Sequence, residues 1–279
     1  MILSLDACYL YELPKIQYEN MELEQRYTNM KELYDLIHNS DAMLFEKFLQ
    51  SDKVINYCKT WDVQAEYVRY KLLHDDTFLL QFVKAPNKQT KHQHYAANWI
   101  SKNIPFIEHV DELSAGGKNA LYVDNGTVRD GIATSQTLTG KSIDFRWIYR
   151  LCNKSLTFYA THKYTKTDGG HQDNQFADVK EFLDEARKSI NTNEYFFSIT
   201  DGQFYQHKYT KVKNDCRTKI EFLNMACQGI RCGATCSNDL LFDMLPVLES
   251  WILKSFPAFN ESVKEELKKI EIIKKRITL

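Results

Sequence analysis

Two neighbouring apolar segments, 142–149 and 156–164, restrict the folds open to this chain. Both have the spacing of β-strands, and Asn153-Lys154 lies near a turn between them, so the sequence predicts two adjacent strands. Gly169 and Gly170 then break the chain. The helix expected next buries a face made of Phe176, Val179, Leu183, Ala186 and Ile190. A strand at 195–200 follows this helix, so the order indicates a mixed α/β core.

The rest of the sequence extends this pattern on both sides. Helical periodicity dominates the first hundred residues, where one face contains Leu23, Tyr27, Met30, Leu33 and Ile37. A second helix near 44–49 has Ser40 as its expected N-cap. Downstream, we expect a strand at 230–235 and helices at 240–252 and 263–275. This order predicts a helical N-terminal section at 1–104, an α/β core at 105–255 and a basic C-terminal helix at 256–279.

The composition favours a soluble globular protein, because 43% of the 279 residues are hydrophobic and 26% are charged. No apolar run approaches the roughly 18 residues of a membrane span, and residues 1–5 lack the basic flank of a signal peptide. We therefore expect a cytoplasmic protein without a membrane partner. A net charge of −1 excludes binding to nucleic acid through bulk charge alone. Residues 141–166, however, contain six Lys or Arg against the single acid Asp144.

The seven cysteines are expected to be reduced thiols. Cys227, Cys232 and Cys236 are spaced five and four positions apart, without the Cys-x₂-Cys pair that is typical of zinc sites. The sequence therefore predicts that these three are small core residues and that the protein holds no zinc.

One constellation in the paired strands indicates chemistry. Side chains alternate along a strand, so Thr161 and Lys163 share one face of the segment 156–164. Asp144 lies near the start of the partner strand. A carboxylate in that place can hold Mg²⁺, and a lysine beside it can orient a water molecule and offset charge on a phosphate. The sequence therefore predicts a site that cleaves phosphodiesters.

These residues resemble the PD-(D/E)XK nuclease superfamily, and within it the type II restriction endonucleases. Asp144 matches the first acid, and Thr161-His162-Lys163 matches the (D/E)XK strand. The segments 112–120, 169–175 and 197–203 also look like parts of the restriction enzyme core, so the resemblance covers roughly 105–250. It implies a mixed-sheet nuclease core that cleaves double-stranded DNA at a short specific sequence and leaves 5′-phosphate ends. It further implies Mg²⁺, a homodimer and a cognate DNA methyltransferase.

The sequence departs from that family at two positions. Thr161 stands where the family usually has Asp or Glu, and Ile143 replaces a proline. The resemblance implies that the backbone carbonyl of His162 also faces the metal. An additional acid from an upstream segment could complete the metal site, and the candidates are Glu108, Asp111 and Glu112.

The expected DNA contacts surround the catalytic strand. Lys141 and Lys166 are candidates for phosphate contacts, while amide side chains can hydrogen-bond to adenine in the major groove. The amides in question are Gln172, Asn174 and Gln175. Their alternative role is structural, as caps and turn contacts of the following helix.

Plainer interpretations remain open for the catalytic residues too. Asp144 could form an ion pair with Arg146 or Lys163 and do nothing more, and Lys166 is close enough to compete with Lys163. At the level of function, the alternatives are a repair or nicking nuclease of the same superfamily and a DNA-binding protein that does not cleave. The recognition sequence cannot be predicted from these residues.

Overall fold

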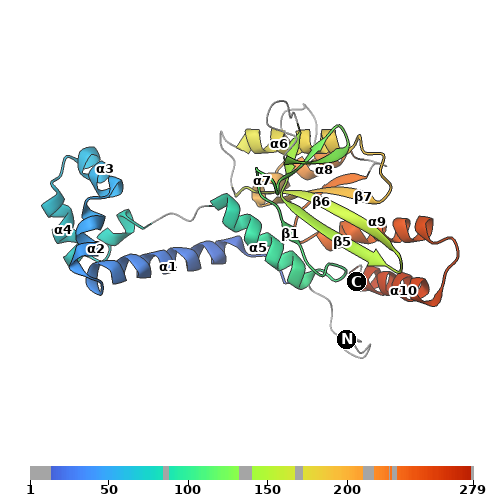
Figure 1. Ribbon diagram of the computed structural model, residues 1–279, viewed down its shortest axis with the longest axis horizontal. Coiled ribbons are helices and arrows are strands. Elements are labelled where there is room, and N and C mark those ends of the chain that lie inside the picture. The colour runs from blue at the N-terminus through green and yellow to red at the C-terminus, as the bar shows by residue number, and fades with distance from the viewer. Residues whose placement is uncertain are drawn as a thin grey trace. The chain divides into compact units, whose positions relative to one another are not determined.

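The computed structural model describes residues 14–83, 88–131, 140–166, 172–209, 217–225, 227 and 231–277. These residues form two compact units (Figure 1). The smaller unit is Gln17–Lys91 and is helical. The larger unit contains His92–Leu279 together with a short N-terminal stretch, and it holds both β-sheets. The chain is therefore a mixed α/β protein.

The smaller unit has a hydrophobic core of its own. Its elements are α1 (Tyr18–His38), α2 (Ala42–Leu49), α3 (Asp52–Trp61), α4 (Ala65–His74) and the 3₁₀ helix η1 (Phe78–Gln81). The core includes Leu33, Ile37, Phe45, Leu49, Val54, Val68, Leu72, Leu79 and Phe82. The expected buried face of α1 is only partly correct, because Leu23 and Tyr27 are 62% and 66% exposed.

The start of α2 also differs from the prediction. Asp41, and not Ser40, is the N-cap, because its side chain accepts a hydrogen bond from the backbone N of Met43 at 3.0 Å. The Ser40 hydroxyl instead donates back to the carbonyl of Leu36 at the end of α1. An aspartate at this position also complements the partial positive charge of the helix start.

A five-stranded mixed sheet forms the centre of the larger unit, with the order β1-β5-β6-β7-β8. Its strands are β1 (Asp111–Glu112), β5 (Phe145–Leu151), β6 (Lys154–Tyr164), β7 (Glu194–Asp201) and β8 (Cys232–Thr235). β5 and β6 form the predicted antiparallel pair, while β6, β7 and β8 run parallel. The parallel step from β6 to β7 is made through α6 (Gln172–Ala186), as in a βαβ unit.

A second, three-stranded sheet has the order β3-β2-β4. It consists of β2 (Leu121–Asp124), β3 (Thr127–Asp130) and β4 (Lys141–Ile143). The single strand expected at 142–149 is thus two strands in different sheets, because β4 pairs with β2 and β5 pairs with β6. Asp144 is the residue at which the chain passes from one sheet to the other.

Helices cover both faces of the five-stranded sheet (Figure 1). On one face, Phe182 of α6 packs near Phe196, which stacks on Tyr159. On the other face, Trp147, Phe158 and Phe197 form a stack. On the same face, Tyr149 contacts Trp251 of α9 (Leu240–Ser255) and donates to Glu266 of α10 (Glu261–Ile277). Most of α5 (Lys88–Asn103) belongs to this unit as well, and the short helices α7 (Gln203–Gln206) and α8 (Lys219–Met225) complete it. α6 ends at Ala186, so the prediction that Ile190 is buried was wrong, since it is 92% exposed.

No helix among the described residues is both long enough and apolar enough to cross a membrane.

Gly202 directly follows β7 and has a backbone conformation that other residues rarely adopt. Its φ is +98°, and a Cβ at this position would lie 2.1 Å from the carbonyl oxygen of Thr165. We expect Gly202→Ala to lose roughly 1–3 kcal/mol of unfolding free energy through backbone strain alone, with the steric clash in addition. Urea denaturation measures this loss. Gly116→Ala is the control, because a Cβ at Gly116 meets nothing within 4 Å. Equal stability of the two variants would contradict the expectation.

Candidate active site

Asp144 lies at the junction of the two sheets and is only 6% exposed. Its backbone N donates to the carbonyl of Ala160 on β6 at 2.8 Å, and its own carbonyl accepts from the backbone N of Leu113 at 2.8 Å. The main chain of this residue is thus held from both sides. The side chain therefore projects from a fixed point at the end of the β5–β6 ladder.

The Asp144 carboxylate is oriented by two hydrogen bonds to the same oxygen. Oδ2 accepts from the Thr161 hydroxyl at 2.9 Å and from the backbone N of His162 at 2.7 Å. Oδ1 accepts no hydrogen bond from any residue that the structure describes. The Thr161 hydroxyl therefore helps to fix the Asp144 carboxylate, and Thr161 adds no second carboxylate to the site.

Lys163 lies two residues beyond Thr161 on β6, opposite Thr200 on β7. Alternation along the strand places its side chain on the same face as those of Thr161 and Asp144. It is half-buried, and it forms no ion pair within the described part of the chain. Arg146 forms an ion pair with Asp111, with 2.8 Å between Nη2 and Oδ2. Neither of the two ion pairs considered for Asp144, with Arg146 or with Lys163, is present among the described residues.

Two oxygen atoms at this site suit a hard cation. Ala160 accepts a backbone hydrogen bond from Asp144, and His162 donates its N–H to Asp144, so both direct their main-chain groups toward β5. The carbonyl of His162 points to the same side as its N–H. Asp144 Oδ1 and this carbonyl match the oxygen ligands of Mg²⁺, which commonly binds through one or two carboxylates, several waters and substrate phosphates. The described residues contain no group of three His, Cys, Asp or Glu placed to hold a metal.

The three candidates for an additional acid are placed differently. Asp111 on β1 pairs with Arg146, whose neighbour across the ladder is Tyr159, so Asp111 shares the sheet face of Asp144. Glu112 is opposite Phe145, on the other face, and its carboxylate contacts Nδ1 of His94 at 2.8 Å. Glu108 precedes β1 and is exposed. None of the three contacts Asp144 through a hydrogen bond.

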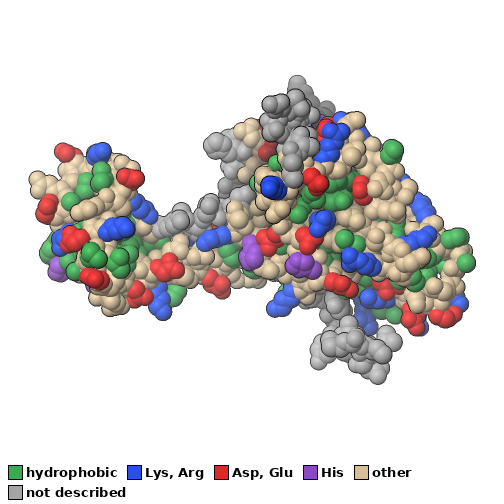
Figure 2. All heavy atoms as spheres, in the orientation of Figure 1, with side chains coloured by type: hydrophobic (Ala, Val, Ile, Leu, Met, Phe, Trp, Pro, Cys, Tyr) green, Lys and Arg blue, Asp and Glu red, His purple; other side chains and the backbone are tan. Residues whose placement is uncertain are grey.

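Most of the basic residues near the site have partners. Lys141 forms ion pairs with Glu181 at 2.7 Å and Asp178 at 3.1 Å on α6, and these carboxylates raise its pKa. Lys166 is exposed. The face of the protein in Figure 2 mixes basic and acidic side chains. The excess of positive charge in residues 141–166 is therefore partly neutralised by the fold, so a DNA contact here would depend on a few placed residues.

The amide side chains at the start of α6 differ in how exposed they are. Asn174 is exposed on the first turn of α6, whereas the side chain of Gln172 lies outside the described residues. Gln175 is half-buried, and its Oε1 accepts a hydrogen bond from the Thr165 hydroxyl. Thr165 directly follows β6, so this bond connects the end of β6 to α6.

For Gln175, this contact favours the structural role over the reading of DNA sequence. We expect Gln175→Ala to lower the melting temperature and to leave the preference among DNA sequences unchanged, because the lost partner is Thr165. Calorimetry and competition binding measure the two effects. Asn174→Ala is the matched control on the same turn, with no loss of stability expected. A Gln175→Ala protein of normal stability that has lost its preference would contradict this assignment.

A buried contact on the other face of the sheet was not predicted from the sequence. Nε2 of His162 lies 3.1 Å from Oδ2 of Asp201 at the end of β7, and both side chains are at most 3% exposed. Ser237, between β8 and α9, donates its backbone N and its hydroxyl to the same carboxylate. A lone histidine inside an apolar strand gives no indication of its partner, which lies 39 positions away.

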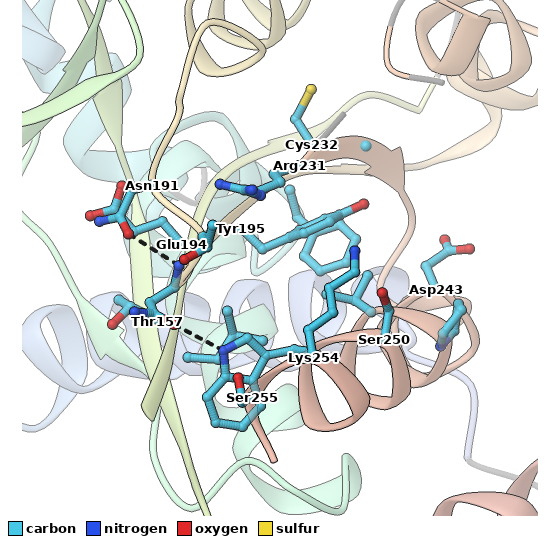
Figure 3. A pocket seen from close by; sticks show the side chains of 18 of the residues that line it. Thr157, Asn191, Glu194, Tyr195, Arg231, Cys232, Asp243, Ser250, Lys254 and Ser255 are labelled. Atoms are coloured by element: carbon cyan, nitrogen blue, oxygen red, sulfur yellow. Dashed lines mark hydrogen bonds between the residues drawn. The ribbon is translucent and has the colours of Figure 1, made fainter. Parts of the chain in front are cut away.

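A trough of about 1190 Å³ lies elsewhere in the larger unit (Figure 3). It is lined by Thr157 on β6, Glu194 and Tyr195 at the start of β7, and Lys254 on α9, among others. Thr157 is six residues from Lys163, or roughly 20 Å along the strand. The trough is thus at the amino ends of the parallel strands, whereas Lys163 is near the carboxyl end of β6. Ligands of open α/β sheets bind at carboxyl ends, which favours the Asp144 site.

Cys227, Cys232 and Cys236 are buried, as expected of core residues. Burial raises the pKa of the Cys236 thiol, which opposes the thiolate form that zinc requires. The absence of zinc from the protein stays a prediction.

Comparisons of the chain with protein-family models, with curated proteins and with solved structures find no match. The assignment of the site therefore depends on the geometry around Asp144 and Lys163.

Proposed function

We propose that this protein is a Mg²⁺-dependent DNA endonuclease. The observation that carries the proposal is the placement of Asp144. Its buried carboxylate is fixed through Oδ2, and Oδ1 accepts no hydrogen bond from the described residues. Lys163, which forms no ion pair with those residues, is on the same sheet face. A fixed carboxylate and an ammonium group on one face suit metal-assisted phosphodiester hydrolysis.

Each residue has a distinct role in this proposal. Asp144 Oδ1 and the His162 carbonyl would hold Mg²⁺, which when bound polarises the scissile phosphate and lowers the pKa of a bound water. Lys163 orients the attacking water and offsets the negative charge that develops on the phosphate. Thr161 keeps Asp144 in place through its hydroxyl, so it acts as a positioning residue.

The sequence resemblance supports the narrower assignment to type II restriction endonucleases. Under this assignment, the substrate is double-stranded DNA with a short specific sequence, and a cognate methyltransferase protects the host DNA. A homodimer is expected, since a palindromic site matches two-fold symmetry. The chemistry is the same in a repair or nicking nuclease, which differs in what it cuts.

The experiment that tests the proposal identifies the ends of the products. Purified protein is incubated with unmethylated phage DNA and Mg²⁺, with EDTA as the control, and the fragment ends are sequenced. Double-strand breaks at one short sequence, with 5′-phosphate ends, are expected. Nicks on one strand would favour a repair or nicking enzyme. Specific binding without any cleavage would favour a DNA-binding protein that has lost activity at Thr161.

A further inference from the structure

Three buried residues form a hydrogen-bonded chain on the sheet face opposite the Asp144 carboxylate. It runs from Ser237 through Asp201 to the imidazole of His162. Ser237 donates its hydroxyl to Asp201 Oδ2 at 2.6 Å and its backbone N to Oδ1 at 2.8 Å. A carboxylate that is 3% exposed needs such partners, and with them it has a single orientation.

The main chain around His162 is held by the ladder with β7 on one side, which continues to Tyr164, but has no strand partner on the other. The ladder between β5 and β6 ends at the pair Phe145–Ala160. Beyond it, on the β5 side, the N–H of His162 donates to the Asp144 side chain instead of to a strand. The imidazole is held from the other face by Asp201 and lies 5.6 Å from the Phe145 ring. The anchored side chain therefore adds to the β7 ladder in holding the His162 main chain where β5 has ended.

We propose that Asp201 and Ser237 are positioning residues of the active site. By fixing His162, they set the hydrogen bond that orients the Asp144 carboxylate, and they set the direction of the His162 carbonyl. The first part concerns only the protein. The second part, which concerns the metal, rests on the proposed function. Outer contacts that fix metal ligands typically change metal affinity or activity by roughly 10–100-fold when they are removed.

Two variants weaken the hydrogen bonds between Ser237, Asp201 and His162 to different extents. Ser237→Ala removes the hydroxyl bond and keeps the backbone bond, while Asp201→Asn keeps the shape of the side chain and removes its charge. The control is Tyr149→Phe, which removes a buried hydroxyl that donates to Glu266 on α10, on a residue of β5 that lies opposite Leu156 and away from His162. All three are made in the full chain and compared with wild type.

The first measurement is amide hydrogen exchange without metal or DNA. The exchange rate at His162 is divided by that at Phe158 on the same strand, because a general loss of stability would raise both. We expect Ser237→Ala to raise this ratio by roughly fivefold, the factor that corresponds to one hydrogen bond. Asp201→Asn should raise it further and Tyr149→Phe should leave it unchanged. An unchanged ratio in Ser237→Ala and Asp201→Asn overturns the proposal.

The second measurement is the Mg²⁺ concentration that gives half-maximal DNA cleavage. It should rise by roughly tenfold in Ser237→Ala and by up to about 100-fold in Asp201→Asn, and it should stay at the wild-type value in Tyr149→Phe. Equal Mg²⁺ requirements in all four proteins overturn the part that concerns the metal. A wild-type protein that never cleaves DNA, with the exchange ratio raised in the two variants, removes the proposed function and leaves the positioning of Asp144 supported.

Discussion

Replacing Asp144 by asparagine should reduce Mg²⁺-dependent DNA cleavage by several orders of magnitude. Asparagine keeps the shape of the side chain but loses the negative charge of Oδ1, the oxygen that would face the metal. Lys163→Ala should have a similarly large effect, because among the described residues it is the only lysine of β6 on the sheet face of Asp144. Single-turnover cleavage rates at saturating Mg²⁺ measure both losses.

The control for this prediction is binding without cleavage. With Ca²⁺ in place of Mg²⁺, both variants should still bind DNA, so that loss of activity cannot be attributed to loss of substrate. Lys254→Ala is a matched lysine variant far from the site, in the lining of the trough at the other end of the strands, and it should cleave normally. An Asp144→Asn protein that cuts at the wild-type rate would show that the active site lies elsewhere.

Replacing His162 by alanine should lower the free energy of unfolding by about 3–5 kcal/mol. The side chain of His162 is fully buried, and without it the Asp201 carboxylate loses a partner inside the protein while a cavity remains beneath Phe145. Denaturation in urea measures the change.

A histidine on the surface supplies the comparison. Nε2 of His109 lies 3.6 Å from Oδ1 of Asp111, but the His109 side chain is 77% exposed. His109→Ala should therefore change stability by no more than about 0.5 kcal/mol, as is usual for surface substitutions. If His162→Ala unfolds at the same urea concentration as His109→Ala, the buried chain through Asp201 does not stabilise the fold.

The elements around the site could be predicted because they depend on local patterns. Alternation and a turn identify β5 and β6, and the helical spacing of Phe176, Val179 and Leu183 identifies α6. The face shared by Thr161 and Lys163 follows from the geometry of any strand. These features need no knowledge of which distant segments meet.

The remaining features depend on pairings between distant segments. The apolar residues at 142–149 look like one strand, yet the chain changes sheets at Asp144, because β4 pairs with β2 whereas β5 pairs with β1 and β6. In the same way, the packing of α6 decides that Lys141 forms an ion pair with Glu181 and that Gln175 accepts a hydrogen bond from Thr165. A sequence shows that such side chains can form hydrogen bonds, but the partner is decided by the tertiary fold.

The most direct test of the central claim uses a supercoiled, unmethylated plasmid. Wild-type protein is titrated with Mg²⁺, and the conversion to linear DNA is followed beside Asp144→Asn. We expect linear product that increases with Mg²⁺ for the wild type, none in EDTA, and none for the variant. A plasmid that stays supercoiled with the folded wild-type protein at every Mg²⁺ and Mn²⁺ concentration would contradict the assignment of Asp144 and Lys163 as a nuclease site.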